Sequence, residues 1–321
     1  MNLNCNFQSH IETVVDFDIH GIVGIRLINP TASDEKALAH QLGLPKTTLN
    51  REPDIVICFQ EKLPMLGLKY QGLDRTGFTD EGFYVLVSSH KKVKVRIPFE
   101  QIGGRCEIVC ENGINAIPLL YHIINFTFLS KNYLPLHSAA FVYENTGILV
   151  TGWATGGKTE ALLAFANQGA KYVGDEWVIL SPDSNEMFAL PTPTSIKKWQ
   201  FPYIPELLAG TNISTAKRLL ISGIHILEDI YNALSWAKLK NVFPVNMLGE
   251  ALPLLKKQQK IWVSPPKFFK DQFHEGRAPL DKVFLIGMHD QTNVEVETCN
   301  PVEVAARMIS SNHYEWQHFF E

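Results

Sequence analysis

The sequence predicts a mixed α/β protein in which a smaller β-rich region, residues 1–130, precedes an α/β domain, residues 131–321. Three observations lead to this prediction. Short apolar or alternating segments, which are typical of strands, dominate the first 130 residues. An apolar strand, a glycine-rich loop and a helix rich in Ala and Leu follow one another over residues 147–168. Apolar residues at helical spacing then extend over residues 205–239.

The composition is that of a globular chain, with 321 residues of which 45% are hydrophobic and 19% charged. A formal net charge of -4 gives no electrostatic reason to expect nucleic acid or an anionic membrane as the main partner. The most apolar run, residues 116–129, contains His122 and Asn125 and is shorter than the roughly 18 residues of a membrane helix. We therefore interpret it as a core helix and expect no membrane partner.

The cysteines and the first residues favour a cytoplasmic protein. Residues 1–6 show no basic segment followed by an apolar stretch, so no signal peptide is predicted. Five cysteines, an odd number, are consistent with reduced thiols. Cys106 and Cys110 share one face of a predicted strand without a second ligand pair, which favours core packing over zinc.

Strand patterns define the N-terminal region. Residues 54–60 and 83–88 are apolar, as in buried strands. In residues 92–97, Val and Ile alternate with Lys and Arg, which predicts a half-exposed strand preceded by a turn at residues 89–91. We interpret its basic face as solvated, with an acidic or phosphorylated partner as the alternative. One helix, the run at 116–129, is expected in this region.

The most informative motif lies between a strand at 147–151 and a helix at 160–168 that stops at Gly169. It fits the pattern G-x-x-x-x-G-K-[ST] with Gly152, Trp153, Ala154, Thr155, Gly156, Gly157, Lys158 and Thr159. Glycines allow the backbone N–H groups and the positive end of the helix to converge on phosphates. Lys158 would contact the β and γ phosphates, and the Thr159 hydroxyl would ligate Mg²⁺. The motif predicts nucleotide binding.

A hairpin is predicted to deliver this loop, because residues 141–143 and 148–150 are strand-like and a short turn separates them. His137 precedes the first of these strands, where a structural histidine is the alternative to a functional one. Downstream, Asp175 and Glu176 lie near the start of a predicted strand at 177–180. Neighbouring strand residues point to opposite faces, so only one acid can face the phosphates unless the backbone is bulged. A solvated strand end is the alternative.

The C-terminal part is predicted to be mainly helical. Gly210 and Gly223 are expected to divide residues 205–239 into several helices that pack on the core, with a substrate lid or an oligomer contact as alternatives. Residues 265–277 are interpreted as a cation-rich loop, and Arg277 or Lys197 could supply charge to a departing phosphoryl group. Residues 281–287 predict a closing strand. The Asn-Pro-Val-Glu sequence at 300–303 predicts the start of a helix that reaches Ser311.

Four segments together resemble the catalytic domain of HPr kinase/phosphorylase and its relatives. They are Leu136 to Ala140, Gly147 to Gly152, Gly157 to Glu160 and Gly169 to Glu176. The likeness is close over residues 133–193. It implies a P-loop domain with a mixed sheet, similar in fold to phosphoenolpyruvate carboxykinase, that uses ATP and Mg²⁺.

The resemblance also implies roles for single residues. Lys158 would act on phosphate and Thr159 on the metal. Asp175 and Glu176 would be metal ligand and general base, in an order that the sequence leaves open. His137 would be hydrogen-bonded to this acidic pair. The implied catalytic residues are thus Asp175, Glu176, His137 and Lys158, and the implied metal ligands are Thr159, Asp175 and Glu176.

The chain also departs from the family pattern. Glu176 stands where the family usually has Asp, and Ala154 and Thr155 replace an inner Ser-Gly. The glycine- and arginine-containing segment that handles HPr is missing, so HPr is not the expected substrate. Residues 190–199 instead resemble the broader group of relatives called serine kinases by similarity.

The resemblance therefore implies an ATP-dependent phosphotransferase, a kinase whose acceptor is a hydroxyl group of a protein or peptide serine or of a small molecule. A nucleotide-gated module that binds ATP without phosphoryl transfer is the alternative. Related enzymes assemble into homo-oligomers, but no segment of this sequence identifies an interface.

Overall fold

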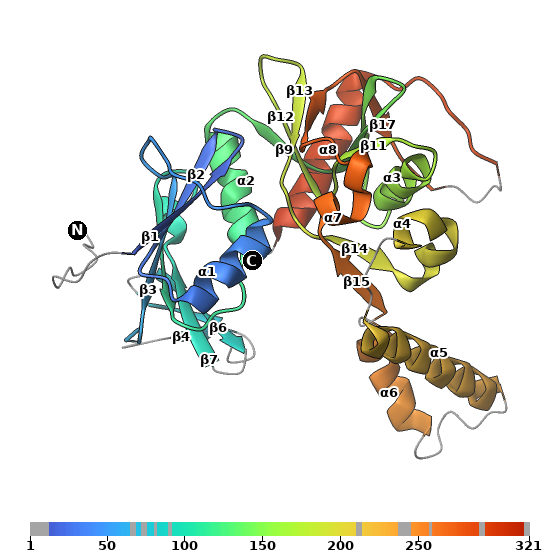
Figure 1. Cartoon of the computed structure of the whole chain (residues 1–321), viewed down its shortest axis with the longest axis horizontal. Coiled ribbons are helices and arrows are strands. Elements are labelled where there is room, and N and C mark those ends of the chain that lie inside the picture. The colour runs from blue at the N-terminus through green and yellow to red at the C-terminus, as the bar shows by residue number, and fades with distance from the viewer. Residues whose placement is uncertain are drawn as a thin grey trace.

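The computed structural model describes residues 13–64, 69–71, 76–79, 82–88, 92–209, 214–236, 245–256, 259–288 and 293–317. It confirms a mixed α/β protein with a β-rich N-terminal region (Figure 1). The described strands form an eight-stranded sheet, a seven-stranded sheet and a two-stranded sheet. Among the described residues, no helix is both long and apolar enough to cross a membrane.

The N-terminal sheet combines parallel and antiparallel pairs. Helices α1 (Ala32–Leu42) and α2 (Leu120–Ser130) pack on it through buried side chains such as Leu38, Ile123 and Phe128. In spatial order its strands are β1 (Val14–Ile19), β2 (Val23–Ile28), β3 (Ile55–Gln60), β8 (Cys106–Glu111), β7 (Lys92–Ile97), β6 (Gly82–Ser88), β5 (Thr76–Thr79) and β4 (Lys69–Gln71).

Three strand predictions in this region are confirmed by β3, β6 and β7. On β7, Val95 and Ile97 are buried while Lys94 and Arg96 are partly exposed, as the alternation predicted. The turn predicted at 89–91 lies outside the described residues. Cys106 and Cys110 are buried in the core, where burial raises the pKa of both thiols, that of Cys106 to about 12. They are packing residues.

The expectation of one helix in this region was wrong, because its described residues already contain two α-helices. The predicted run at 116–129 corresponds to α2 (Leu120–Ser130), and α1 (Ala32–Leu42) was missed. Thr31 and Asp34 form a reciprocal capping box at the start of α1, and Gly43 ends it in the left-handed conformation. The capping signature was present in the sequence, but few apolar residues follow it.

The second sheet is built around one long strand, β9 (Leu134–Tyr143), which pairs with β10 (Thr146–Thr151), β11 (Lys171–Gly174) and β12 (Trp177–Leu180). The predicted β9–β10 hairpin is confirmed; both residues of its turn, Glu144 and Asn145, have positive φ, as a tight hairpin requires. His137 lies within β9, opposite Trp177, and not before the strand as expected.

Two strands complete one edge of this sheet and one completes the other. β13 (Glu186–Ala189) pairs with β12 and with β16 (Arg277–Pro279). β17 (Lys282–Leu285) runs parallel to β10 and confirms the predicted closing strand.

Two helices cover opposite faces of the second sheet. Alternate residues of β9 and β10 pack against α3 (Lys158–Ala166) on one face and against α8 (Pro301–Trp316) on the other. The Asn300 side chain accepts a hydrogen bond from the Val302 N–H at 2.9 Å, so the predicted helix start is confirmed. The helix continues past Ser311 to Trp316.

The two large sheets share apolar contacts. Trp177 and Phe188 of the second sheet belong to the same buried cluster as the N-terminal core, and the Phe126 and Trp316 rings of α2 and α8 lie 5.2 Å apart. The His20 Nε2 atom is 2.7 Å from the Ala189 carbonyl oxygen. The N-terminal region thus contacts β12, which directly follows the two acidic residues, and its neighbour β13.

The segment after residue 190 forms a projection. β14 (Thr194–Lys197) and β15 (Lys260–Val263) make the two-stranded sheet, and η2 (Lys198–Tyr203), α4 (Pro205–Ala209), α5 (Thr215–Trp236) and α6 (Val245–Lys256) lie between them in sequence. Figure 1 shows α5 and α6 extending away from both large sheets.

Three expectations for this segment need correction. Gly223 lies inside α5 and does not break it, and Gly210 lies outside the described residues. Most of α5 does not pack on the core, since among its described side chains only Ile221 belongs to the α3-side cluster. The cation-rich loop contains two short helices, α7 (Pro265–Phe269) and η3 (Lys270–Gln272).

Candidate functional site

The glycine-rich loop connects β10 directly to α3 and has the geometry of a phosphate cradle. Gly152 and Gly157 have φ values of 151° and 100°, which favour glycine. A Cβ atom at Gly152 would lie 2.6 Å from the Ile286 carbonyl oxygen, so this position has no room for a side chain. The first N–H groups of α3 point out of the helix end. A compact anion is the ligand that such an end attracts.

Lys158 is a buried cation at the start of α3. It is 5% exposed, and its ammonium group donates to the carbonyl oxygens of Gly152 at 3.1 Å and Trp153 at 2.8 Å. Burial lowers the pKa of Lys158. Within the described part of the chain, no carboxylate lies within 4.0 Å of this ammonium group. The carboxylates of Glu315, Glu176 and Asp175 act on it only from a longer distance, so a bound anion would be its first direct ionic partner.

Asp175 faces the same point from the sheet. The Thr159 hydroxyl donates to its two carboxylate oxygens at 3.1 and 3.3 Å. Asp175 is 2% exposed, and this burial together with the nearby charge of Glu176 raises the pKa of its carboxyl group. A buried carboxylate that accepts from the Thr159 hydroxyl and from the Glu176 backbone, without a cation in direct contact, is a natural ligand for a metal ion.

The backbone between β11 and β12 separates the two acids. Both strands pair with β9, but the register shifts after Tyr172, and Glu176 has a φ of 73°. This irregularity lets Asp175 face Thr159 while Glu176 faces His137. Both acids were expected near the start of one strand. In the structure they form the link between β11 and β12.

His137 joins Glu176 to a residue that sequence reasoning missed. Its Nε2 atom is 3.4 Å from Glu176 Oε2, and its Nδ1 atom is 2.6 Å from Glu315 Oε1. Burial alone would lower the pKa of His137, but hydrogen bonds with Glu176 and Glu315 outweigh it and raise the pKa to about 9. The three side chains form a carboxylate–imidazolium–carboxylate row.

Glu315 lies on α8, whose inner face supports the whole site. The Thr151 hydroxyl contacts the Met308 sulfur, and the Ser311 hydroxyl donates to the Gly152 carbonyl at 3.4 Å. The Asn312 amide donates to the Pro135 carbonyl at 2.8 Å. Residues 308, 311, 312 and 315 have the spacing of one helix face, and this was the signal that could have identified Glu315.

Lys197 and Arg277 lie in different places. Lys197 Nζ is 3.9 Å from Glu160 Oε1, so it lies beside the first turn of α3. The Gln200 amide donates to the same oxygen at 3.0 Å and holds this segment in position. Arg277 instead pairs with Glu186 at 2.7 Å and lies over the Phe188 ring. The structure brings Lys197, and not Arg277, to the loop.

Magnesium suits the donors at the start of α3. Mg²⁺ commonly takes one or two protein ligands together with phosphates and waters, and Thr159 and Asp175 offer such a pair. Glu176, the third predicted ligand, faces His137. Among the described residues, no group of three or more His, Cys, Asp or Glu side chains could hold a metal ion by itself. Any ion here would need ligands from a bound molecule.

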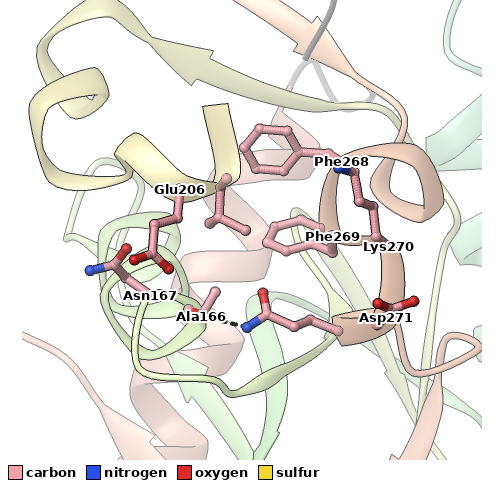
Figure 2. Close-up of a pocket in the computed structure, with 9 residues that line it drawn as sticks. Ala166, Asn167, Glu206, Phe268, Phe269, Lys270 and Asp271 are labelled. Atoms are coloured by element: carbon pink, nitrogen blue, oxygen red, sulfur yellow. Dashed lines mark hydrogen bonds between the residues drawn. The ribbon is translucent and has the colours of Figure 1, made fainter. Parts of the chain in front are cut away.

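A cavity of about 230 Å³ lies at the other end of α3, as Figure 2 shows. Its lining includes Ala166 and Asn167 at the end of α3, Glu206 of α4, and Phe268 and Phe269 of α7. The Gln272 amide closes one side by donating to the Ala166 carbonyl at 3.1 Å. Because Lys158 begins α3 and Ala166 ends it, this cavity is not part of the candidate site.

No protein-family model matches the chain. A search of curated proteins finds none with significant similarity to it. The chemistry of the site must therefore be inferred from its own residues.

Proposed function

We propose that this protein is an ATP-dependent kinase of the HPr kinase-like type that transfers the γ-phosphoryl group to a hydroxyl. The observation that carries the proposal is the meeting of three groups at the start of α3. An ammonium group that has no direct ion pair with any described residue (Lys158), a hydroxyl (Thr159) and a buried carboxylate (Asp175) meet there. An accessible carboxylate, Glu176, lies beside them.

Phosphate binding follows from the loop and Lys158. In the ligand-free geometry the Lys158 ammonium is bound by two loop carbonyls. The charged oxygens of a bound polyphosphate would replace these two carbonyl oxygens as acceptors for Lys158. They would also accept hydrogen bonds from the backbone N–H groups at the start of α3. Magnesium, held by Thr159 and Asp175 with the phosphates, would neutralise the charge that develops on the transferring group.

We assign the general base to Glu176. The Asp175 side chain is buried and accepts from the Thr159 hydroxyl, whereas the Glu176 side chain is 42% exposed. Interaction with His137 lowers the pKa of Glu176, so the carboxylate is ionised near neutral pH. Positioning within hydrogen-bond reach of the acceptor is then the main requirement for proton transfer.

The proposed phosphoryl transfer forms one bond to phosphorus and breaks another. The acceptor hydroxyl oxygen forms a bond to the γ-phosphorus as the bond to the bridging oxygen of ADP breaks. The hydroxyl proton moves to Glu176, and the negative charge leaves on ADP. Lys158 stabilises the phosphate charge throughout, and Lys197 lies close enough to the first turn of α3 to add a second positive charge.

The cellular setting is proposed to be the cytoplasm. The described cysteines are free thiols, as expected in a reducing compartment that supplies ATP and magnesium.

The proposal is tested by the fate of γ-labelled phosphate from Mg-ATP in a size-fractionated cell extract. Wild type is compared with Lys158→Ala and with Lys171→Ala, a matched change of an exposed lysine on β11. We expect label on an acceptor with wild type and Lys171→Ala, and none with Lys158→Ala. Label on a macromolecule identifies a protein or peptide serine, and label on a small compound identifies a metabolite.

Two further variants separate the roles of the acids. Glu176→Gln should bind Mg-ATP with an affinity close to that of wild type and transfer no phosphate. Asp175→Asn should lose the magnesium dependence of ATP binding. If wild type binds ATP but moves no more label than Lys158→Ala, the protein is a nucleotide-binding module and the kinase proposal is wrong.

A further inference from the structure

The beginning of η2 is held against the first turn of α3, next to the candidate phosphate site. The Gln200 side chain is buried and makes two hydrogen bonds there. It donates to Glu160 Oε1 of α3 at 3.0 Å and accepts from the Lys197 backbone N–H at 2.7 Å. These bonds determine where the intervening residues lie relative to the phosphate loop.

Trp199 is one of these intervening residues, and its indole ring is open to solvent. The residue is 54% exposed. The Lys197 ammonium group lies 6.0 Å from the centre of the ring and 3.9 Å from Glu160 Oε1. Isolated exposed apolar residues are ordinary, but a tryptophan that is anchored on both sides beside a charged site is suited to stacking on a ligand.

The adjoining two-stranded sheet carries positive charge on the same side as Lys197. Lys197 and Lys260 are direct partners in the β14–β15 register, so their side chains leave the same face of the sheet. Like charges directly opposite each other are destabilising. Within the described part of the chain, no carboxylate lies within 4.0 Å of the Lys260 ammonium group, which lies 4.6 Å from the centre of the Trp262 ring. A bound anion would stabilise this face.

The direction of the proposed phosphoryl transfer decides on which side a nucleoside would lie, and this step rests on the proposed function. The acceptor hydroxyl and the leaving ADP lie on opposite sides of the γ-phosphorus. The acceptor lies beside Glu176, the proposed base. The α-phosphate and the nucleoside therefore extend away from Glu176, along the start of α3, where Glu160 contacts Lys197 and Gln200.

A second exposed ring near the loop lies on the acceptor side. Trp153 is 49% exposed and packs edge-on against Tyr314, with ring centres 6.3 Å apart. Tyr314 directly precedes Glu315, which contacts His137 at 2.6 Å. His137 in turn contacts the proposed base. Trp153 is therefore better placed to meet the acceptor than the nucleobase.

We propose that Trp199 is the nucleobase platform of this protein, on which the purine of a bound nucleoside triphosphate stacks, while Lys197 faces the α-phosphate. Stacking uses the π-face that all bases share, so the platform accepts adenine and guanine alike. The loop and Lys158 then recognise the triphosphate, and Trp199 makes a separate contribution to affinity through the base.

The first test compares the binding of Mg-ATP and Mg-tripolyphosphate, which has the phosphates but no base, by calorimetry. Trp199→Ala should bind Mg-ATP roughly 5- to 150-fold more weakly than wild type, the range expected for the loss of one base–aromatic stack. Its affinity for Mg-tripolyphosphate should stay within about twofold of wild type. Trp236→Ala is the matched control, because Trp236 is 90% exposed at the end of α5, which extends away from the body (Figure 1). It should change neither affinity.

Further variants test whether the ring itself is required. Trp199→Phe keeps an aromatic ring and should retain most of the affinity for Mg-ATP, whereas Trp199→Leu is apolar without a ring and should lose it. Trp199→Ala should weaken Mg-GTP and Mg-ATP by similar factors. In wild type, ATP should change the tryptophan fluorescence more than tripolyphosphate does, and Trp199→Phe should remove this difference.

Several results would overturn the platform and leave phosphate binding intact. They are an unchanged affinity of Trp199→Ala for Mg-ATP, an equal loss of Mg-ATP and Mg-tripolyphosphate, and a wild type that binds the two ligands equally well. Loss of Mg-ATP affinity in Trp153→Ala but not in Trp199→Ala would place the base on the other side of the loop. A wild type that binds neither ligand would overturn the proposed function itself, and the platform with it.

Discussion

Replacing Glu315 with Gln should lower the stability of this protein by an amount that depends on pH. Glu315 and Glu176 flank His137 at 2.6 and 3.4 Å, and together they raise its pKa to about 9 from the ordinary value of 6.5. This difference corresponds to about 3 kcal/mol of folding free energy. Because the folded-state pKa is the higher one, the stabilisation is fully present below about pH 6.5 and is lost as the pH rises through 9.

Glu315→Gln keeps the shape of the side chain but removes one of the two charges. If the two carboxylates contribute comparably, the variant should lose about 2 kcal/mol at pH 6, and its His137 should titrate at a clearly lower pH than in wild type. At pH 9.5 His137 is largely neutral in both proteins. The difference should then shrink to the value of a neutral hydrogen bond, below about 1 kcal/mol.

The assay is urea unfolding of wild type and variant at pH values between 6 and 9.5, combined with NMR titration of His137. Glu303→Gln is the matched control on the same helix, because Glu303 forms only an exposed pair with Arg307. It should change stability by less than about 1 kcal/mol at every pH. A Glu315→Gln effect of equal size at pH 6 and pH 9.5, or an unchanged His137 titration, would refute the reasoning.

Three further predictions concern the loop and the buried acid. Gly152→Ala should cost about 2 kcal/mol or more in urea unfolding, since its Cβ atom would meet the Ile286 carbonyl at 2.6 Å, whereas Gly287→Ala, with open space around it, should be close to neutral. Thr155 has a φ of 61°, so Thr155→Gly should relieve about 1–2 kcal/mol of strain, partly offset by glycine entropy, and should bind ATP at least as tightly in calorimetry. Above pH 7, Asp175→Asn should raise the melting temperature of the ligand-free protein, because it removes a buried charge. This gain should vanish in acid, where Asp175 is protonated. A lower melting temperature of the variant at pH 8 would contradict the inferred cost of that charge.

Local patterns in the sequence predicted the parts of the fold that local forces determine. The loop at 152–159, the β9–β10 hairpin and the start of α8 each depend on glycine, turn or capping residues within a few positions, and each appears where expected. The predicted alternation of apolar and basic residues along β7 is also confirmed, because one face of this strand is buried.

The remaining features depend on contacts between distant segments. Glu315 is 178 residues from His137, and only the packing of α8 under β9 brings them together. The two acids were expected on one strand, but the register shift along β9 divides that segment into β11 and β12. Gly223 has low helix propensity, yet α5 continues through it because the helix is supported on one face by α6.

A single strand determines how far the phosphate loop lies from the acidic pair. One edge of β9 hydrogen-bonds β10, which ends at the loop, and its other edge holds first β11 and then β12, which flank Asp175 and Glu176. Residues 134–180 therefore contain both halves of the site in one uninterrupted piece of sequence. The long segment between β14 and β15 could be lengthened, shortened or exchanged during evolution without changing that distance. A protein built in this way can acquire new partners through its projection while its chemistry stays constant.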